Sequence, residues 1–260
     1  MGSRLNCELR NSSRGEHLTF ELAEKSTTGK VESRPFLSYH IMHVKICGIR
    51  RSEDALLAAH CGADAVGLLV GQRHSSLDFI TATLAGEIAR TLPPSVEAVL
   101  VTHITEVDEI ERLLRQSGIT AVQLHSEITA DSVANLRTRF PDLKVFKSVH
   151  VISVDSVAYP EAFTKVVDGF VLDTINVATD QVGGTGDTHD WSISRKIVER
   201  FPDVPIILAG GLTSENVRAA IESVHPFGVD VNSGTKGCDG FKDARKMREF
   251  ILEARREVLP

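Results

Sequence analysis

The feature that most constrains the fold of this chain is a repeated unit, in which a short apolar stretch precedes a polar turn and an amphipathic segment. The first unit begins at residues 44–49 (VKICGI), and Ser52 is expected to cap the helix that follows. The inner side of that helix is expected to carry Ala55, Leu56, Ala59 and Cys61. Seven further apolar stretches follow, at residues 65–70, 97–103, 121–125, 144–149, 169–174, 205–209 and 228–231. The segments between and after them predict helices at 52–61, 81–92, 105–116, 129–139, 156–166, from about 190, 214–224 and 242–258.

Eight strand–helix units predict a (β/α)8 TIM barrel of the α/β class. Strands that are apolar along their whole length are typical of a parallel sheet covered by helices on its outer face. Eight units of this size match what a closed barrel requires. The alternative is a doubly wound open sheet, which usually carries a G-x-G-x-x-G loop after its first strand. Residues 47–50 (CGIR) do not match that loop.

The first forty residues differ from the rest of the chain. They are polar, show no sustained period, and lack the apolar core that a signal peptide needs. We therefore expect residues 1–41 to be a disordered extension and residues 42–260 to be the barrel catalytic domain. Because Met42 directly precedes the first strand, it is a candidate for the natural start of the protein.

Charge and cysteine usage argue against several classes of partner. The formal net charge is −6, so the chain has no basic footprint for nucleic acid. Its four cysteines are far apart and form no C-x-x-C pair, which argues against a metal site or a disulfide framework and favours the cytoplasm. No apolar run reaches the roughly eighteen residues of a membrane helix.

In a barrel of this kind, the active site lies where the strands end. The polar residues at or near these ends are Cys47, Thr102, His103, Gln123, His125, Lys147, Asp173, Asp230 and Asn232. We expect them to converge on one mouth. Two of the loops there also contain glycine, namely Gly210-Gly211 after the seventh strand and Ser233-Gly234 after the eighth. Loops in these two positions often hold phosphate through backbone N–H groups, whereas the alternative is ordinary turn glycines.

Several motifs together resemble phosphoribosylanthranilate isomerase of tryptophan biosynthesis, from about Val44 to the C-terminus. They are residues 45–49 (KICGI), 123–125 (QLH), 172–174 (LDT), 183–186 (GGTG) with 190–191 (DW), 208–212 (LAGGL) with 216–217 (NV), and 229–234 (VDVNSG). The resemblance implies a ketol-isomerase, an intramolecular oxidoreductase that carries out the Amadori rearrangement of an aminoaldose phosphate to an aminoketose phosphate. The family's reaction requires no cofactor. The implied partner is a phosphorylated small molecule, and we expect a cytoplasmic monomer or homodimer.

The resemblance also implies roles for individual residues. Cys47 is the general base and Asp173 the general acid, so the site should stabilise a thiolate and keep the carboxyl group protonated. Asp230 contacts substrate, and the loop at 183–186, with Gly184 at the phosphate, folds over it. Gln123 and His125 match in pattern, although a hydrogen-bonding role in the core explains them equally well.

The chain departs from the family pattern beside the second and third strands. The family carries an arginine after the second strand, which binds the anthranilate carboxylate, but Asp78 stands there in this sequence. Arg73 and His74 are nearby cations that could replace it. Thr102-His103 stands where the family has an apolar residue and asparagine. We expect sugar-phosphate chemistry to be retained, with His103 and Arg73 as candidate substrate contacts.

Three alternatives to the family's own reaction follow from these residues. The enzyme could isomerise a related phosphosugar whose aglycone is not anthranilate. Lys147 could form a Schiff base in an aldolase-type lyase. The barrel could also bind a sugar phosphate without catalysis.

Overall fold

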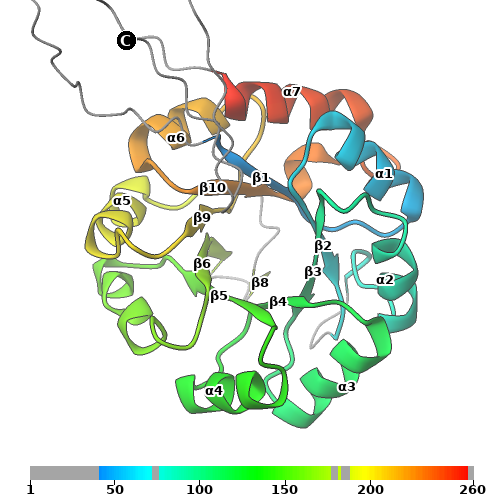
Figure 1. Cartoon of the computed structure of the whole chain (residues 1–260). Coiled ribbons are helices and arrows are strands. Elements are labelled where there is room, and N and C mark those ends of the chain that lie inside the picture. Colours follow the sequence, from blue (N-terminus) through cyan, green and yellow to red (C-terminus); the bar gives the residue numbers. More distant parts are fainter. Residues whose placement is uncertain (1–40, 72–75, 177–180, 183–187, 257–260) are drawn as a thin grey trace, which may run out of the picture. The chain divides into compact units, whose positions relative to one another are not determined.

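The computed structural model describes residues 41–71, 76–176, 181–182 and 188–256. Eight parallel strands close into a barrel in the order β1-β10-β9-β6-β5-β4-β3-β2 (Figure 1). Their bounds are β1 His43–Ile46, β2 Ala65–Leu69, β3 Glu97–Thr102, β4 Ala121–Leu124, β5 Lys144–His150, β6 Gly169–Asp173, β9 Ile206–Leu208 and β10 Gly228–Val231. The predicted (β/α)8 barrel is therefore confirmed, and the open sheet is excluded because the barrel closes between β1 and β2.

Seven α-helices of the described chain surround the barrel (Figure 1). They are α1 Ser52–Cys61, α2 Ala82–Ala89, α3 Val107–Ser117, α4 Ala130–Arg139, α5 Trp191–Arg200, α6 Val217–Val224 and α7 Ala244–Arg255. Several begin where a side-chain oxygen caps a free backbone N–H, as Thr81 does for Leu84 and Asp243 for Lys246. Two end at a glycine in the left-handed conformation, Gly62 after α1 and Gly118 after α3. Among the described residues, no helix combines the length and apolar character needed to cross a bilayer.

The segment after β5 is not the helix that we expected at residues 156–166. It folds instead as two short 3-10 turns, η1 Val154–Val157 and η2 Tyr159–Ala162. Ser153 and Ser156 cap the first turn reciprocally, which closes it after four residues. Pro160 then lacks the N–H that a continuing α-helix would need.

The first helix also differs in detail from the expectation. It starts at Ser52 itself, and the capping position is Arg51, whose side chain caps no N–H group. Ala55 and Ala58 are buried whereas Leu56 is 47% exposed. Consecutive helical positions are about 100° apart, so a stripe through Ala55 and Ala58 turns Leu56 towards solvent.

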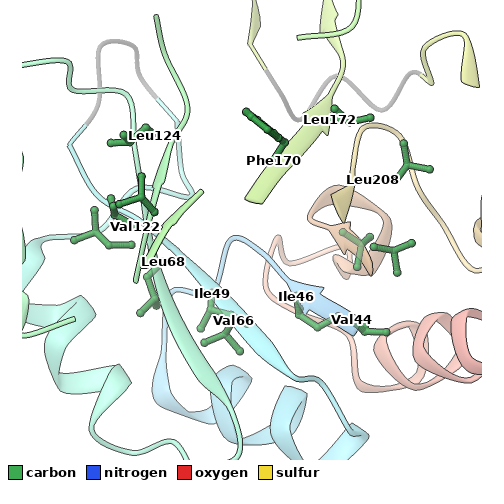
Figure 2. Close-up of a cluster of buried hydrophobic side chains, with 14 of the residues drawn as sticks. Val44, Ile46, Ile49, Val66, Leu68, Val122, Leu124, Phe170, Leu172 and Leu208 are labelled. Carbon is green, nitrogen blue, oxygen red and sulfur yellow. The ribbon is translucent and has the colours of Figure 1, made fainter. Parts of the chain in front are cut away.

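Strand side chains alternate between the helices and the barrel interior. Figure 2 shows the outward set, which includes Val44 and Ile46 from β1, Val66 and Leu68 from β2, and Phe170 from β6. These belong to the main core, between barrel and helices. The inward positions carry two smaller apolar clusters and several polar side chains, among them Lys45 and Cys47. The residues that carry chemistry therefore come from the opposite face of the same strands.

A short antiparallel pair follows β6, formed by β7 Ile175–Asn176 and β8 Gln181–Val182. The expected extension, residues 1–41, falls outside the described residues except for Ile41. Its disorder and the natural start at Met42 stay predictions.

Candidate active site

Cys47 lies at the end of β1, and Asp173 lies at the end of β6. Two other strands, β10 and β9, lie between them in the barrel order. The Cys47 side chain packs in the interior cluster with Ala65 and Val99 and is 8% exposed. A Cβ atom on Gly67 of β2 would lie only 2.5 Å from Cys47 Sγ. Glycine is therefore required there to leave room for the thiol.

A buried lysine organises the barrel interior beneath Cys47. Lys45 Nζ donates to the Asp230 carboxylate and, at 2.9 Å, to Gln123 Oε1. A lysine can only donate, so Gln123 must present its oxygen to Lys45 and its NH2 group to the other side. There, Gln123 Nε2 donates to Ser148 Oγ at 3.0 Å. Lys45 thus fixes the orientation of the amide.

This chain of hydrogen bonds allows a tautomer of His125 that is protonated on Nε2. Ser148 Oγ accepts from Gln123, so its own hydrogen is free to reach His125 Nδ1 at 2.9 Å. The ring then carries its proton on Nε2, which lies 4.0 Å from Asp173 Oδ2. Burial, together with the neighbouring His150 and His103, holds the pKa of His125 well below its ordinary value. His125 is therefore neutral beside Asp173.

Burial shifts the pKa of the two expected catalytic groups in the same direction. It raises the pKa of Asp173 to about 7, and Asp230 adds to this while the Thr174 N–H, at 2.7 Å, opposes it. It raises the pKa of Cys47 to about 11, against the opposing charges of Lys45 and Lys242. A carboxyl group that keeps its proton near neutrality agrees with the expectation for Asp173. The expected stabilisation of a Cys47 thiolate is not met in the ligand-free site, because burial outweighs the charges of Lys45 and Lys242 and the thiol keeps its proton at pH 7.

The glycine loops after β9 and β10 lie against each other and against the end of β6. Gly210 and Gly211 both have positive φ, 83° and 63°, and a Cβ on Gly210 would lie 2.1 Å from Thr174 Oγ1. A Cβ on Gly234 would lie 2.1 Å from the Leu212 carbonyl oxygen. In the described part of the chain, the amides of Gly210 and Gly211 have no protein acceptor. Together with Ser233, these loops provide backbone donors at the mouth.

A row of aromatic and imidazole rings lines the ends of β3, β4 and β5. The ring centroids are 5.4 Å apart for Phe79 and His103, 4.9 Å for His103 and His125, and 5.2 Å for His125 and His150. His103 is therefore close to His125, and through it to Asp173. The rings are tilted or edge-on to one another, with interplanar angles of 71°, 34° and 84°.

Asp78 is paired in an ion-pair cluster. Lys236 Nζ, from the loop after β10, donates to both of its carboxylate oxygens, at 2.7 and 2.6 Å. Asn232 Nδ2 donates to the same carboxylate at 3.0 Å. Lys242 Nζ in turn donates to Asn232 Oδ1 at 3.1 Å and to the Asn232 carbonyl oxygen at 2.7 Å. The carboxylate at position 78 is thus compensated by side chains that the sequence analysis did not associate with it.

Two of the nine residues that we expected at the mouth point elsewhere. Lys147 lies between the inward residues Phe146 and Ser148, so it projects outwards, where its Nζ lies 5.3 Å from the Tyr159 ring centroid. Thr102 likewise faces away from the interior and accepts a hydrogen bond from the Ile104 N–H at 3.1 Å. The alternative in which Lys147 forms a Schiff base with a substrate at the mouth is therefore wrong, because its amine lies outside the barrel interior.

Other expected residues lie outside the described part of the chain. They are Arg73 and His74 after β2 and the loop at 183–186, including Gly184. Five residues of the site were not predicted from the sequence, namely Lys45, Ser148, His150, Lys236 and Lys242. Lys45 and Ser148 carried a signal, because each stands on the inward face of an apolar strand where a polar group needs a partner.

The comparisons with known proteins agree with one another. Residues 44–253 match the family described as N-(5'-phosphoribosyl)anthranilate (PRA) isomerase. N-(5'-phosphoribosyl)anthranilate isomerase 2 of Methanosarcina mazei is 50% identical over 216 residues, which is 83% of this chain and 95% of that protein.

The chain is also similar to solved structures of phosphoribosyl anthranilate isomerases. The phosphoribosyl anthranilate isomerase of Thermotoga maritima is 35% identical, with a TM-score of 0.70 over 82% of this chain and 98% of that one. A phosphoribosyl anthranilate isomerase in complex with reduced 1-(o-carboxyphenylamino)-1-deoxyribulose 5-phosphate is 33% identical, with a TM-score of 0.66 over the same shares. The family match covers the whole barrel, and the chain belongs to the N-(5'-phosphoribosyl)anthranilate isomerase family of (β/α)8-barrel isomerases.

Proposed function

We propose that this enzyme converts N-(5'-phosphoribosyl)anthranilate to 1-(o-carboxyphenylamino)-1-deoxyribulose 5-phosphate, the family's step in tryptophan biosynthesis, with Asp173 as acid and Cys47 as base. The observation that carries the assignment is the placement of Cys47 and Asp173 across the barrel, where desolvation raises the pKa of Asp173 to about 7. A group that titrates near the working pH is best suited to give up a proton in one step and regain it in the next.

The first step opens the furanose ring. Asp173 gives its proton to the ring oxygen, the bond between that oxygen and C1 breaks, and the lone pair of the anthranilate nitrogen forms a C=N bond to C1. The product is a positively charged iminium. The neutral His125, with its Nε2 4.0 Å from Asp173 Oδ2, adds no charge that would lower the pKa of the acid.

The second step removes a proton from C2. Cys47 takes this proton, and the electrons of the C–H bond form a C1=C2 double bond while those of the C=N bond return to nitrogen. The base is the Cys47 thiolate, which exists when the single proton of the Cys47–Asp173 pair lies on Asp173. The adjacent iminium charge opposes the effect of burial on the pKa of the thiol. The enol then gains a proton at C1 and loses one from its C2 hydroxyl group, which gives the ketone and leaves the overall atom count unchanged.

The phosphate is assigned to the backbone of the loops after β9 and β10. The unpaired amides of Gly210 and Gly211 are suitable donors, and Ser233 and Gly234 supply the second loop. Asp230, held by Lys45, and Gln123 are assigned to the interior side of the sugar. Gly184 would complete the phosphate site. No cofactor enters this scheme. A cytoplasmic location and a monomeric or homodimeric state accompany the proposal as expectations.

A coupled fluorescence assay tests the proposal by following the loss of phosphoribosylanthranilate generated in place. We expect turnover by the wild type and a decrease in kcat of about 10²–10⁴-fold in Cys47→Ser. Cys61→Ser is the matched control, because Cys61 lies in α1, on the outer helical layer. A folded wild type that binds pentose phosphate but turns over no substrate would refute the proposal and leave a non-catalytic sugar-phosphate binder. Full activity in Cys47→Ser would refute the role of the thiol.

A further inference from the structure

Asp78 stands at the position where the family carries an arginine that binds the anthranilate carboxylate. The loop after β10 places Lys236 beside Asp78. We propose that Lys236 binds the carboxylate of the substrate's aromatic group, and that Asp78 positions this lysine. The inference rests on the proposed function and assigns the recognition of the ring. It moves the binding cation from the loop after β2 to the loop after β10.

The first observation is that Asp78 is compensated. Only 6% of the residue is exposed, and both of its oxygens accept from Lys236 Nζ while one also accepts from Asn232 Nδ2. Such a carboxylate has little capacity left to repel a second anion, because its charge is balanced at hydrogen-bond distance.

The second observation is that Lys236 keeps binding capacity. An ammonium group has three N–H donors, and in the described structure its acceptors are the two oxygens of one carboxylate. Its side chain is 27% exposed, so a ligand can reach it. Lys242 differs, because it is 6% exposed and its Nζ already has three acceptors, two on Asn232 and one on Thr235. Lys236 is therefore the member of this cluster that a ligand can engage.

The third observation places this cation beside the reacting groups. Asn232 joins the two regions, because its side chain donates to Asp78 and also packs on Gly48, the residue after Cys47. A Cβ on Gly48 would lie 2.3 Å from Asn232 Oδ1. Asp78 also directly precedes Phe79, the first ring of the row that leads to His125. An aromatic acid fits this arrangement, with its ring on the row and its carboxylate on Lys236.

A pair of matched ligands separates carboxylate recognition from the rest of binding. One is reduced 1-(o-carboxyphenylamino)-1-deoxyribulose 5-phosphate, and the other is the same compound without the carboxyl group. Their dissociation constants are measured by calorimetry for the wild type and for Lys236→Met. Lys236→Arg is included because it keeps the charge. Asp78→Asn/Lys236→Met removes both partners of the ion pair, so that no buried carboxylate is left unpaired if the single variant folds poorly.

We expect the wild type to prefer the carboxylated ligand about tenfold to a hundredfold, as one charge-assisted hydrogen bond provides. Lys236→Met and the double variant should reduce this preference to about threefold or less, with little change for the other ligand. Lys236→Arg should retain most of it. Lys144→Met is the matched control, because this lysine pairs with Glu97 and is 60% exposed at the start of β5.

A preference that survives in both Lys236→Met and the double variant would overturn the proposal. The proposal would also be overturned if Arg73→Gln lost the preference for the carboxylated ligand while Lys236→Met kept it. That result would assign carboxylate binding to the loop after β2. In either case turnover by the wild type would leave the proposed reaction standing. A wild type that shows no preference and no turnover would refute both.

Discussion

Two neighbouring clusters at the barrel mouth handle charge in different ways. In the acid–base cluster, Lys45, Cys47 and Asp230 are buried among the strands, and the side chain of Asp173 is 13% exposed. The ring-side cluster, formed by Asp78, Phe79, His103 and Lys236, lies at the ends of β2, β3 and β10, and its lysine reaches solvent. Burial in the first cluster raises the pKa of both proposed catalytic groups, whereas close ion pairing balances the charges of the second.

Chemistry and specificity are separable in this fold. Groups that must exchange protons are positioned by the rigid strand ends, where desolvation sets their pKa. Groups that select the aglycone come from loops, which can exchange one cation for another without disturbing the strands. The substitution of arginine by Asp78 is therefore compatible with a retained acid–base pair.

Asp173→Asn should have the largest effect, because it removes the proton donor and leaves the fold intact. We expect kcat to fall by about 10²–10⁴-fold with little change in KM. Steady-state kinetics with phosphoribosylanthranilate measures both constants. Asp155→Asn, in the exposed turn η1, is the matched control and should retain full activity.

Lys45→Met tests whether the acid–base cluster depends on its buried ion pair. It leaves the Asp230 carboxylate buried without its cation, since Asp230 is 6% exposed. We expect the free energy of unfolding to fall by about 3–5 kcal/mol, measured by urea denaturation. Lys144→Met removes the exposed partner of Glu97 and should cost less than about 1 kcal/mol. Equal losses in the two variants would contradict the distinction between buried and exposed pairs.

The pH dependence of kcat/KM tests the assignment of the two pKa values. The reactive form of the enzyme holds a proton on Asp173 and none on Cys47. Between about pH 7 and pH 11 the dominant form holds its proton on Cys47 instead, so the two forms contain the same number of protons and their ratio does not change with pH. We therefore expect kcat/KM to rise about tenfold per pH unit from pH 5 to 7 and then to level off. A decline between pH 7 and 9 would mean that the thiol of the free enzyme is already ionised at neutrality.

Lys236→Met should have a smaller effect on stability than Lys45→Met. Asp78 would keep its hydrogen bond from Asn232, and the lost lysine is partly solvated. We expect the free energy of unfolding to fall by about 1–2 kcal/mol. The double variant Asp78→Asn/Lys236→Met should lie closer to the wild type, because it leaves no unpaired charge. A loss as large as that of Lys45→Met would place Lys236 in the structural core instead.

The sequence predicted the barrel well because the apolar strands and their helices follow regular periods. It failed after β5, where Pro160 and reciprocal serine caps replaced the expected helix with short turns. It also placed Lys147 at the mouth, although the two-residue alternation of β5 directs it outwards. Whether a strand residue faces the barrel interior or the helices depends on its position in the two-residue alternation, and an error of one residue reverses the predicted side.

The candidate site was predicted unevenly for a physical reason. Cys47 and Asp173 end apolar strands, so their position follows from local sequence. Lys236 is separated from Asp78 by 158 positions along the chain, and no local pattern indicates that the two meet. Contacts between loops of this kind depend on the closed barrel and appear only when the fold is assembled.

The most direct test of the division between the two clusters is one set of steady-state measurements on Asp173→Asn and Lys236→Met with the same substrate. We predict that Asp173→Asn lowers kcat by at least about a hundredfold with KM within about threefold of the wild type. Lys236→Met should raise KM about tenfold or more and leave kcat within about threefold. A Lys236→Met variant that loses kcat as Asp173→Asn does, with KM unchanged, would contradict the account.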